Sequence, residues 1–202
     1  MIKNYAEILE DNRRGDIVCG PYSEAYIIQR ILKYNESFND IRSYIVDTTG
    51  GFKDFSFDYG RIINNHIMKD LDLLELKNIL MAYPDAEITT IDLSDSEDKA
   101  LAVKNIITSI FNKTVDDAYN EKQIYSLLYV NNFDRFINND SEFSAMYKRI
   151  LKLSRHCCVY PTGICNDTNS IHITDVNAEI VNYSKILVPK REKFPGGIKY
   201  IA

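Results

Sequence analysis

The chain has no tryptophan, only four cysteines among its 202 residues, and no long apolar run. Few and unevenly placed cysteines exclude a disulfide framework in a chain of this length, so we expect reduced thiols. A membrane span needs about 20 predominantly apolar residues, and the N-terminal stretch MIKNYAEILEDNRRGD carries no apolar signal core. We therefore expect a cytoplasmic protein without membrane insertion, either free or peripheral to a membrane-bound machine.

Positive charge is also scarce, because 24 lysines and arginines face 29 aspartates and glutamates for a net charge of −5. Sequence-independent binding of nucleic acid depends on lysine and arginine at the phosphates, so nucleic acid is not the expected partner. One basic group, Lys185, Lys190, Arg191 and Lys193, is interrupted by Glu192 and is typical of a solvated turn. A nucleic-acid-binding accessory protein stays a weaker alternative. With no composition break or repeat, residues 1–202 are predicted to form a single domain.

Short β-branched runs alternate with amphipathic stretches along the chain. We expect strands at 16–19, 42–46, 61–68, 87–92, 125–130, 157–160, 185–188 and 199–201, and helices at 23–34, 70–83, 96–111 and 141–154. This alternation predicts an α/β fold with a mainly parallel sheet and helices on both faces. Function in such a fold lies at the carboxyl ends of the strands, where GPYSEAY, DTTGG, NNFD and PTGICND are all predicted to fall.

The first of these segments has the layout of a phosphate-binding loop. A working loop, GxxxxGK[ST], needs a lysine for the β and γ oxygens and a hydroxyl for magnesium. In that register Tyr26 replaces the lysine and Ile27 the hydroxyl, while Glu24 adds an acid where phosphate charge would lie. Ser23 is predicted to cap the helix that follows. The candidate site is therefore a vestigial phosphate loop made of Gly20, Ser23, Ala25, Tyr26 and Ile27.

The second segment, YSLLYVNNFD, is a buried strand that ends in Asn131 and Asn132, where an ATPase would carry two acids. Amides neither hold Mg²⁺ with comparable strength nor accept a proton. Asp134 is predicted to lie just after the strand, as a helix or turn cap. The alternative function is a metal-dependent phosphoryl-transfer or hydrolase enzyme that uses the strand-end carboxylates Asp47, Asp92 and Asp134.

Two further groups have a simple structural interpretation. His156, Cys157, Cys158 and Cys165 lie within ten residues, but the adjacent cysteines are predicted to point to opposite faces of a strand and lack the spacing of a zinc site. We expect buried thiols and no metal. The aromatic loop residues Phe52, Phe55, Phe57 and Tyr59 form either an exposed interface or part of the core, and the sequence leaves both open.

Read in order, several segments resemble the HerA/FtsK group of RecA-like P-loop ATPases, closest to those of conjugative transfer and type IV secretion. The likeness is carried by GDIVCGPYSEAYIIQRIL with RSYIVDTTGGF, ITTIDLSDSEDKALAVKNIITSIFNKTVDD, YSLLYVNNFDRF, SEFSAMYKRILKLSRHCCVYPTGICND and KILVPKREKFPGGIKY. A type VII secretion ATPase module is a near alternative. Besides the phosphate-loop changes, Gly51 replaces an acid after the second strand, Asn131 and Asn132 the acid pair, and Asn166 a sensing glutamine.

The resemblance implies a RecA-like fold that has lost its catalytic residues. It predicts a pseudo-ATPase without enzymatic activity that serves as a structural or interaction subunit of a conjugation or secretion machine. Its partners would be proteins, in a homo- or hetero-oligomer. No cofactor is expected, and ATP with magnesium would bind only weakly.

Overall fold

The computed structural model of the chain describes residues 14–37, 40–59, 61–64, 88–120, 124–172, 175–194 and 197–202. The helix predicted at 70–83 and the second half of the strand predicted at 61–68 lie outside these residues.

A seven-stranded sheet in the order β3-β4-β2-β5-β6-β1-β7 forms the centre of the molecule, and every pair of neighbouring strands in it is parallel. Its strands are β1 (Gly15–Cys19), β2 (Ile41–Asp47), β3 (Arg61–Asn64), β4 (Ile88–Asp92), β5 (Tyr125–Val130), β6 (Val159–Cys165) and β7 (Ser184–Leu187). All residues of β1 and β4 are buried, as expected for parallel strands covered on both faces. The predicted α/β class is confirmed.

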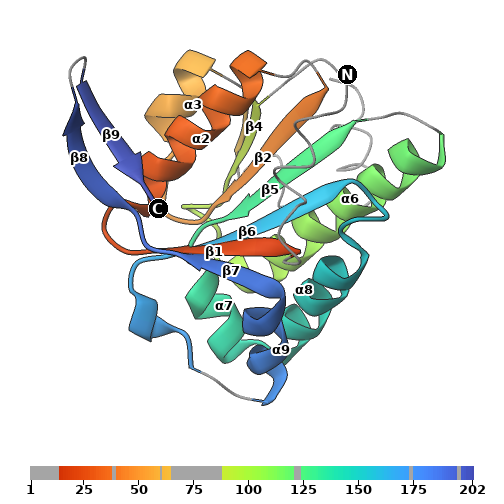
Figure 1. Cartoon of the computed structure of the whole chain (residues 1–202). Coiled ribbons are helices and arrows are strands. Elements are labelled where there is room, and N and C mark those ends of the chain that lie inside the picture. The colour runs from red at the N-terminus through yellow and green to blue at the C-terminus, as the bar shows by residue number, and fades with distance from the viewer. Residues whose placement is uncertain are drawn as a thin grey trace.

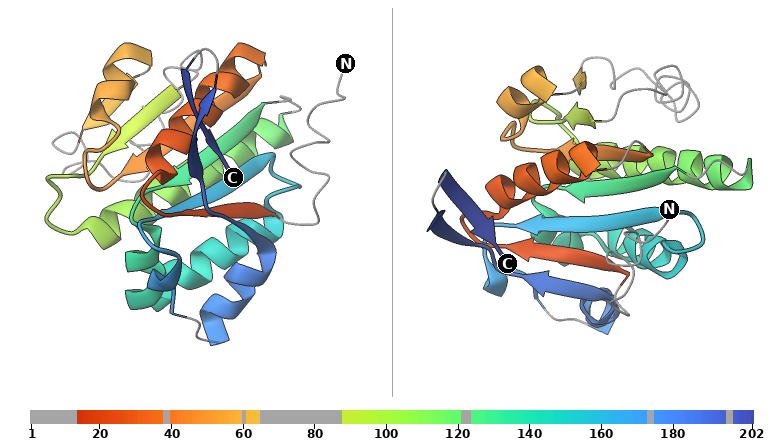
Figure 2. Two further views of the ribbon diagram at one scale, coloured as in Figure 1. Left: turned by 60° about the vertical axis from the view of Figure 1, so that its left-hand side comes forward. Right: turned by 45° about the horizontal axis from the view of Figure 1, so that its top comes forward.

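Helices cover both faces of this sheet (Figures 1 and 2). On one face, α2 (Ser23–Ser37) and α3 (Lys53–Tyr59) pack through a cluster that includes Ile27, Ile31 and Phe52. The other face is covered by α6 (Lys99–Tyr119), α7 (Phe133–Asn139), α8 (Ser141–Leu153) and α9 (Asp175–Tyr183). A short 3-10 helix, Thr168–Ser170, follows β6.

The strands that lead to the candidate segments are neighbours in the centre of the sheet. β6 lies between β1, which leads into the predicted loop at Gly20, and β5, which is followed directly by Asn131. The carboxyl ends of β1, β2, β5 and β6 therefore meet at one edge, where the four predicted segments lie.

Two of the predicted aromatic loop residues belong to the core. Phe52 is fully buried and Phe55 is 8% exposed, both within the cluster under α2. The interface interpretation is therefore wrong for these two residues. The side chains of Phe57 and Tyr59 lie outside what the structure describes.

The cysteines before β6 lie in a turn rather than on a strand. Residues 154–158 continue α8 as a turn in which the Cys157 N–H donates to the Leu153 carbonyl at 3.1 Å. Cys158 has a φ of 51°, so the chain reverses there before β6 starts at Val159. The prediction that Cys157 and Cys158 occupy opposite faces of a strand is therefore wrong.

The C-terminal segment forms a separate hairpin of β8 (Lys190–Phe194) and β9 (Gly197–Ile201). It projects from the main sheet and leans against α2 (Figures 1 and 2). Gln29 fixes it, because its amide donates to the Ile198 carbonyl at 3.2 Å and accepts the Tyr200 N–H at 3.0 Å. The strand predicted at 199–201 thus pairs within the hairpin and does not join the main sheet. No helix in the described part of the chain has the length and apolar character needed to cross a membrane.

Candidate functional site

The connection from β1 to α2 is a tight turn in which the N–H groups of Gly20 and Ser23 are hydrogen-bonded within the protein. Gly20 adopts a φ of 110°, and its N–H donates to the Cys165 carbonyl at 3.1 Å. Pro21 has no N–H, and the Ser23 N–H donates back to the Gly20 carbonyl at 3.1 Å. A phosphate loop instead directs its N–H groups at the ligand. This turn therefore offers an anion little of the backbone cradle that such a loop provides.

The remaining residues of the predicted vestigial loop lie within α2. Ile27 is fully buried, and Tyr26 donates its N–H to the Tyr22 carbonyl at 3.0 Å. The Ser23 hydroxyl donates to the carbonyls of Gly20 at 2.8 Å and Cys165 at 3.3 Å. It thereby ties the turn to β6, a role different from the predicted capping.

Asp47, at the end of β2, accepts hydrogen bonds from the glycine turn that follows and stabilises its conformation. Its carboxylate is fully buried, and Oδ1 accepts the N–H groups of Thr49 and Gly50 and the Thr49 hydroxyl, each at 3.0 Å. Oδ2 accepts the Phe52 N–H at 2.9 Å. Gly50 has a φ of 82°, which an L side chain rarely adopts. A metal ion at Asp47 would have to compete with these four donors.

Asn131, at the end of β5, links three elements through its amide. Its Nδ2 donates to Thr49 Oγ1 at 2.8 Å, Glu24 Oε1 at 3.1 Å and Asp47 Oδ1 at 3.3 Å. Its Oδ1 accepts the Asn132 N–H at 2.9 Å. A carboxylate in this place could not donate, and it would lie beside two other carboxylates. The amide is therefore the group that this arrangement requires.

Glu24 places its carboxylate in the first turn of α2, where the helix dipole favours negative charge. A Cβ added to Gly51 would lie 2.7 Å from Glu24 Oε1, so the carboxylate lies directly against the backbone of that glycine. The chain's own anion thus occupies the region between the start of α2 and the ends of β2 and β5. The sequence identified Glu24 only as unfavourable for phosphate; its pairing with Asn131 was missed.

Of the other two candidate carboxylates, Asp92 lies beside Asp47 and Asp134 lies next to Cys165. Asp92 pairs in register with Asp47, and it contacts Lys53 Nζ at 2.8 Å and the Ser94 N–H at 2.9 Å. Burial alone would raise the pKa of Asp92, but the hydrogen bonds from Lys53 and Ser94 outweigh it, and the pKa is lowered. Asp134 lies in the first turn of α7, next to Cys165. Among the described residues no group of three or more His, Cys, Asp or Glu side chains could hold a metal ion.

The remaining asparagines and the cysteines have structural positions. Asn132 begins α7 with a left-handed φ of 54°, a conformation that asparagine tolerates, and Asn166 is exposed after β6. Cys19 and Cys165 are partners in the β1–β6 register and both are buried. The hydrogen bond between their thiols lowers the pKa of Cys19 and raises that of Cys165. All four cysteines are free thiols; Cys19, Cys157 and Cys165 are buried as predicted, whereas Cys158 is only half-buried.

Comparison with known proteins gives little further information. No family model matches the chain, and no curated protein matches it. Among solved structures, the cytoplasmic domain of EssC is similar with a TM-score of 0.49 and 11% identity. The match covers 88% of this chain and 33% of that one, so the chain spans about a third of the matched protein's length. A likeness at this level assigns no function, and the functional argument depends on the strand ends.

Proposed function

We propose that this chain is a catalytically inactive RecA-like domain that acts as a structural or interaction subunit of a secretion machine. The observation that carries the proposal is the network at the carboxyl edge of the sheet, in which Asn131 binds Glu24 and Asp47. The Asn131 amide thus bonds to two carboxylates at the edge of the sheet where a nucleotide would bind in an active ATPase.

The chemistry of phosphoryl transfer supports this proposal. That reaction depends on a cation at the transferred phosphate, on oxygen ligands for Mg²⁺ and on a group that positions the nucleophile. Here Tyr26 and Ile27 belong to the body of α2, Asp47 is saturated with hydrogen bonds, and Glu24 adds negative charge where a triphosphate would bind.

The secretion context is supported by the resemblance of the sequence to the HerA/FtsK group. Within that group we favour the ATPases of conjugative transfer and type IV secretion, with type VII secretion modules as the near alternative. A subunit of this kind would act through its surfaces, in a homo- or hetero-oligomer peripheral to a membrane-bound assembly. It would need neither ATP nor metal.

Titration with ATP in the presence of magnesium tests the proposal. We expect no heat of binding in the micromolar range, no phosphate release and no shift of the thermal unfolding midpoint. Magnesium-dependent micromolar binding would overturn it.

A Glu24→Gln variant identifies which feature prevents binding. It removes the internal negative charge but leaves the closed turn at Gly20 and the missing lysine. We therefore expect no nucleotide binding in this variant either. Magnesium-dependent binding gained by this single change would show that the rest of the site is intact, which would contradict the proposal.

A further inference from the structure

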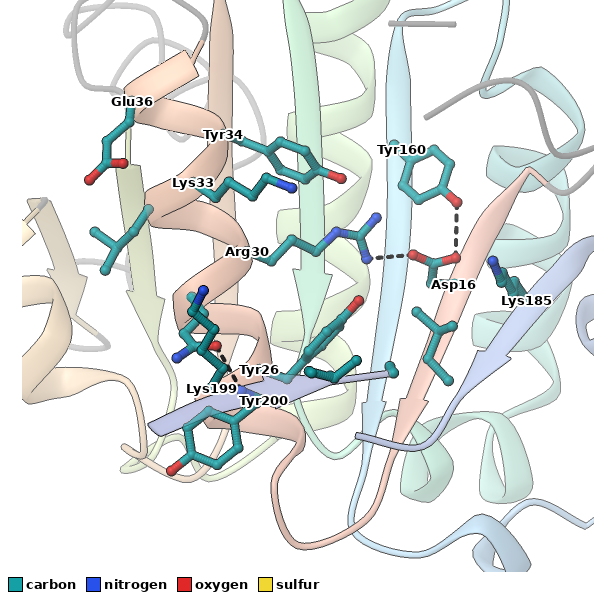
Figure 3. Close-up of a pocket in the computed structure, with 15 residues that line it drawn as sticks. Asp16, Tyr26, Arg30, Lys33, Tyr34, Glu36, Tyr160, Lys185, Lys199 and Tyr200 are labelled. Carbon is teal, nitrogen blue, oxygen red and sulfur yellow. Dashed lines mark hydrogen bonds and ion pairs between the residues drawn. The ribbon is translucent and has the colours of Figure 1, made fainter. Parts of the chain in front are cut away.

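A groove of about 720 Å³ lies on the α2 side of the sheet, away from the strand-end network. We call it the basic groove. Its walls are α2 and β9, and its floor is formed by β1, β6 and β7 (Figure 3). The volume is within the range of ligand-binding pockets in proteins.

A buried ion pair fixes the floor of the basic groove. Arg30 reaches from α2 to Asp16 on β1, with Nη1 2.5 Å from Oδ2, and the Tyr160 hydroxyl donates to Oδ1 at 2.9 Å (Figure 3). The guanidinium lies over the rings of Tyr34 and Tyr160, at 5.5 Å and 5.6 Å from their centroids. Asp16 is 2% exposed. The floor is thus rigid and electrically neutral, because each charge is paired.

The rim of the basic groove is positively charged. Lys33 comes from α2, Lys185 from β7 and Lys199 from β9, and all three are exposed, whereas Glu36 is the acid of the rim (Figure 3). Residues 184–202 together carry five basic side chains against one acidic one, although the whole chain has a net charge of −5. A local field of this sign attracts an acidic partner.

Exposed apolar side chains gather around the same region. Nine large apolar side chains are exposed in the described part of the chain, and five of them lie on or beside the hairpin: Tyr22, Val188, Phe194, Ile198 and Ile201. Ile186 is also exposed, but it alternates with Lys185 and Leu187 along β7 and therefore faces the other side of the sheet. Tyr22 and Tyr200 also contact each other, with ring centroids 5.7 Å apart. Apolar and aromatic side chains gathered beside a charged rim are typical of a protein interaction surface.

We infer that the basic groove, together with the hairpin beside it, binds an acidic, extended segment of a partner protein. The inference deepens the proposed function, on which it rests, because it names the chemistry of the partner. Acidic side chains of the segment would contact Lys33 and Lys199. Its apolar side chains would cover Ile201, which lines the groove on the same face of β9 as Lys199.

Two other occupants fit less well. Single-stranded nucleic acid needs open aromatic faces on which bases stack. The guanidinium of Arg30 already lies over the rings of Tyr34 and Tyr160, and Tyr200 contacts Tyr22. A small inorganic anion would use the lysines but would leave the exposed apolar side chains uncovered.

The test measures fluorescence anisotropy with a short labelled peptide in which glutamate alternates with valine. We expect saturable binding that weakens as salt is added, because the contacts are exposed ion pairs. The double variant Lys33→Glu/Lys199→Glu should bind roughly tenfold more weakly or worse, because both rim charges are reversed. The double variant Arg135→Glu/Arg149→Glu, which makes the same charge change at exposed positions on α7 and α8, should bind like the wild type.

Several outcomes would overturn the inference. These are equal binding of a peptide with lysine in place of glutamate, equal loss in the control variant, or stronger binding of single-stranded DNA, anionic vesicles or inorganic phosphate to the same groove. Magnesium-ATP is titrated in parallel. If the protein binds both magnesium-ATP and the peptide, only the proposed inactivity is refuted. If it binds neither, only the inferred role of the basic groove is refuted.

Discussion

At the scale of single residues, the hydroxyl of Tyr147 is a polar group buried in an apolar part of the core. The side chain is fully buried between Phe133 and Phe143, with ring centroids 4.6 Å and 5.8 Å away. Burial raises its pKa well above the usual value, and its hydroxyl has no hydrogen-bond partner among the described residues. A buried polar group without a partner costs about 1–3 kcal/mol.

We therefore expect Tyr147→Phe to raise the free energy of unfolding, measured in urea, by about 1 kcal/mol. Tyr160→Phe is the matched control, because it removes a hydroxyl that donates to Asp16 and should lower stability instead. A Tyr147→Phe protein that is less stable than the wild type would show that the hydroxyl has a stabilising partner.

Asn131 illustrates how far single residues can be understood from the sequence. The apolar run of 125–130 located the end of the strand correctly, and the absence of acids there was apparent from the sequence. The sequence could not reveal why an amide is needed, because Glu24 and Thr49 approach Asn131 only after α2 and the turn after β2 have folded onto β5.

At the scale of elements, the turn after β2 depends on one carboxylate. Asp47 accepts four hydrogen bonds from Thr49, Gly50 and Phe52 and a fifth from Asn131. We expect Asp47→Ala to lower the free energy of unfolding by about 2–4 kcal/mol, since buried donors lose their acceptor. Asp58→Ala, at an exposed position of α3, should change it by less than about 0.5 kcal/mol. Equal effects of both changes would contradict this account of the turn.

The sequence predicted helices and strands accurately where the apolar periodicity is strong. It failed where tertiary contacts determine the ends of an element. The helix predicted at 96–111 begins only at Lys99, where Asp98 caps it through the Leu101 N–H, and it extends to Tyr119. The sequence NKTVDDAY shows weak periodicity, but Lys113 pairs with Asp117 inside the protein and Asp117 also contacts Arg42. These contacts stabilise helical turns that the apolar pattern does not mark.

At the scale of the whole molecule, several carboxylates make stability depend on pH. Burial alone would raise the pKa of Asp92 and Asp140, but hydrogen bonds to each carboxylate have the larger combined effect, so both pKa values are lowered. The pKa of Glu179 is lowered by its contacts with Lys148 and Lys152. A group whose pKa is lower in the folded state contributes stability above its unfolded pKa and loses that contribution as the pH falls through the folded value.

We therefore expect the urea midpoint to vary little near neutral pH and to fall below about pH 4, where unfolded carboxylates take up protons. The double variant Asp92→Asn/Asp140→Asn should lose less stability over the same acid range than the wild type. An unchanged acid dependence in this variant would show that other groups cause the transition.

The α/β class and the parallel sheet followed from the alternation of short apolar runs and amphipathic stretches. The hairpin did not, because its position depends on the contacts of Gln29 with β9, which come from distant parts of the chain. The groove could not be predicted from the basic group near the C-terminus, because only the fold brings Lys33 near Lys199.

The Glu24 carboxylate lies at the carboxyl edge of the sheet, bonded to Asn131, and we therefore expect that no nucleotide binds there. A crystal structure of the protein grown with magnesium and a non-hydrolysable ATP analogue tests it most directly. We expect the Glu24 carboxylate to remain bonded to Asn131, with no triphosphate beside Gly20. An ordered triphosphate and metal ion between Gly20 and Asn131, with Glu24 displaced, would contradict the account.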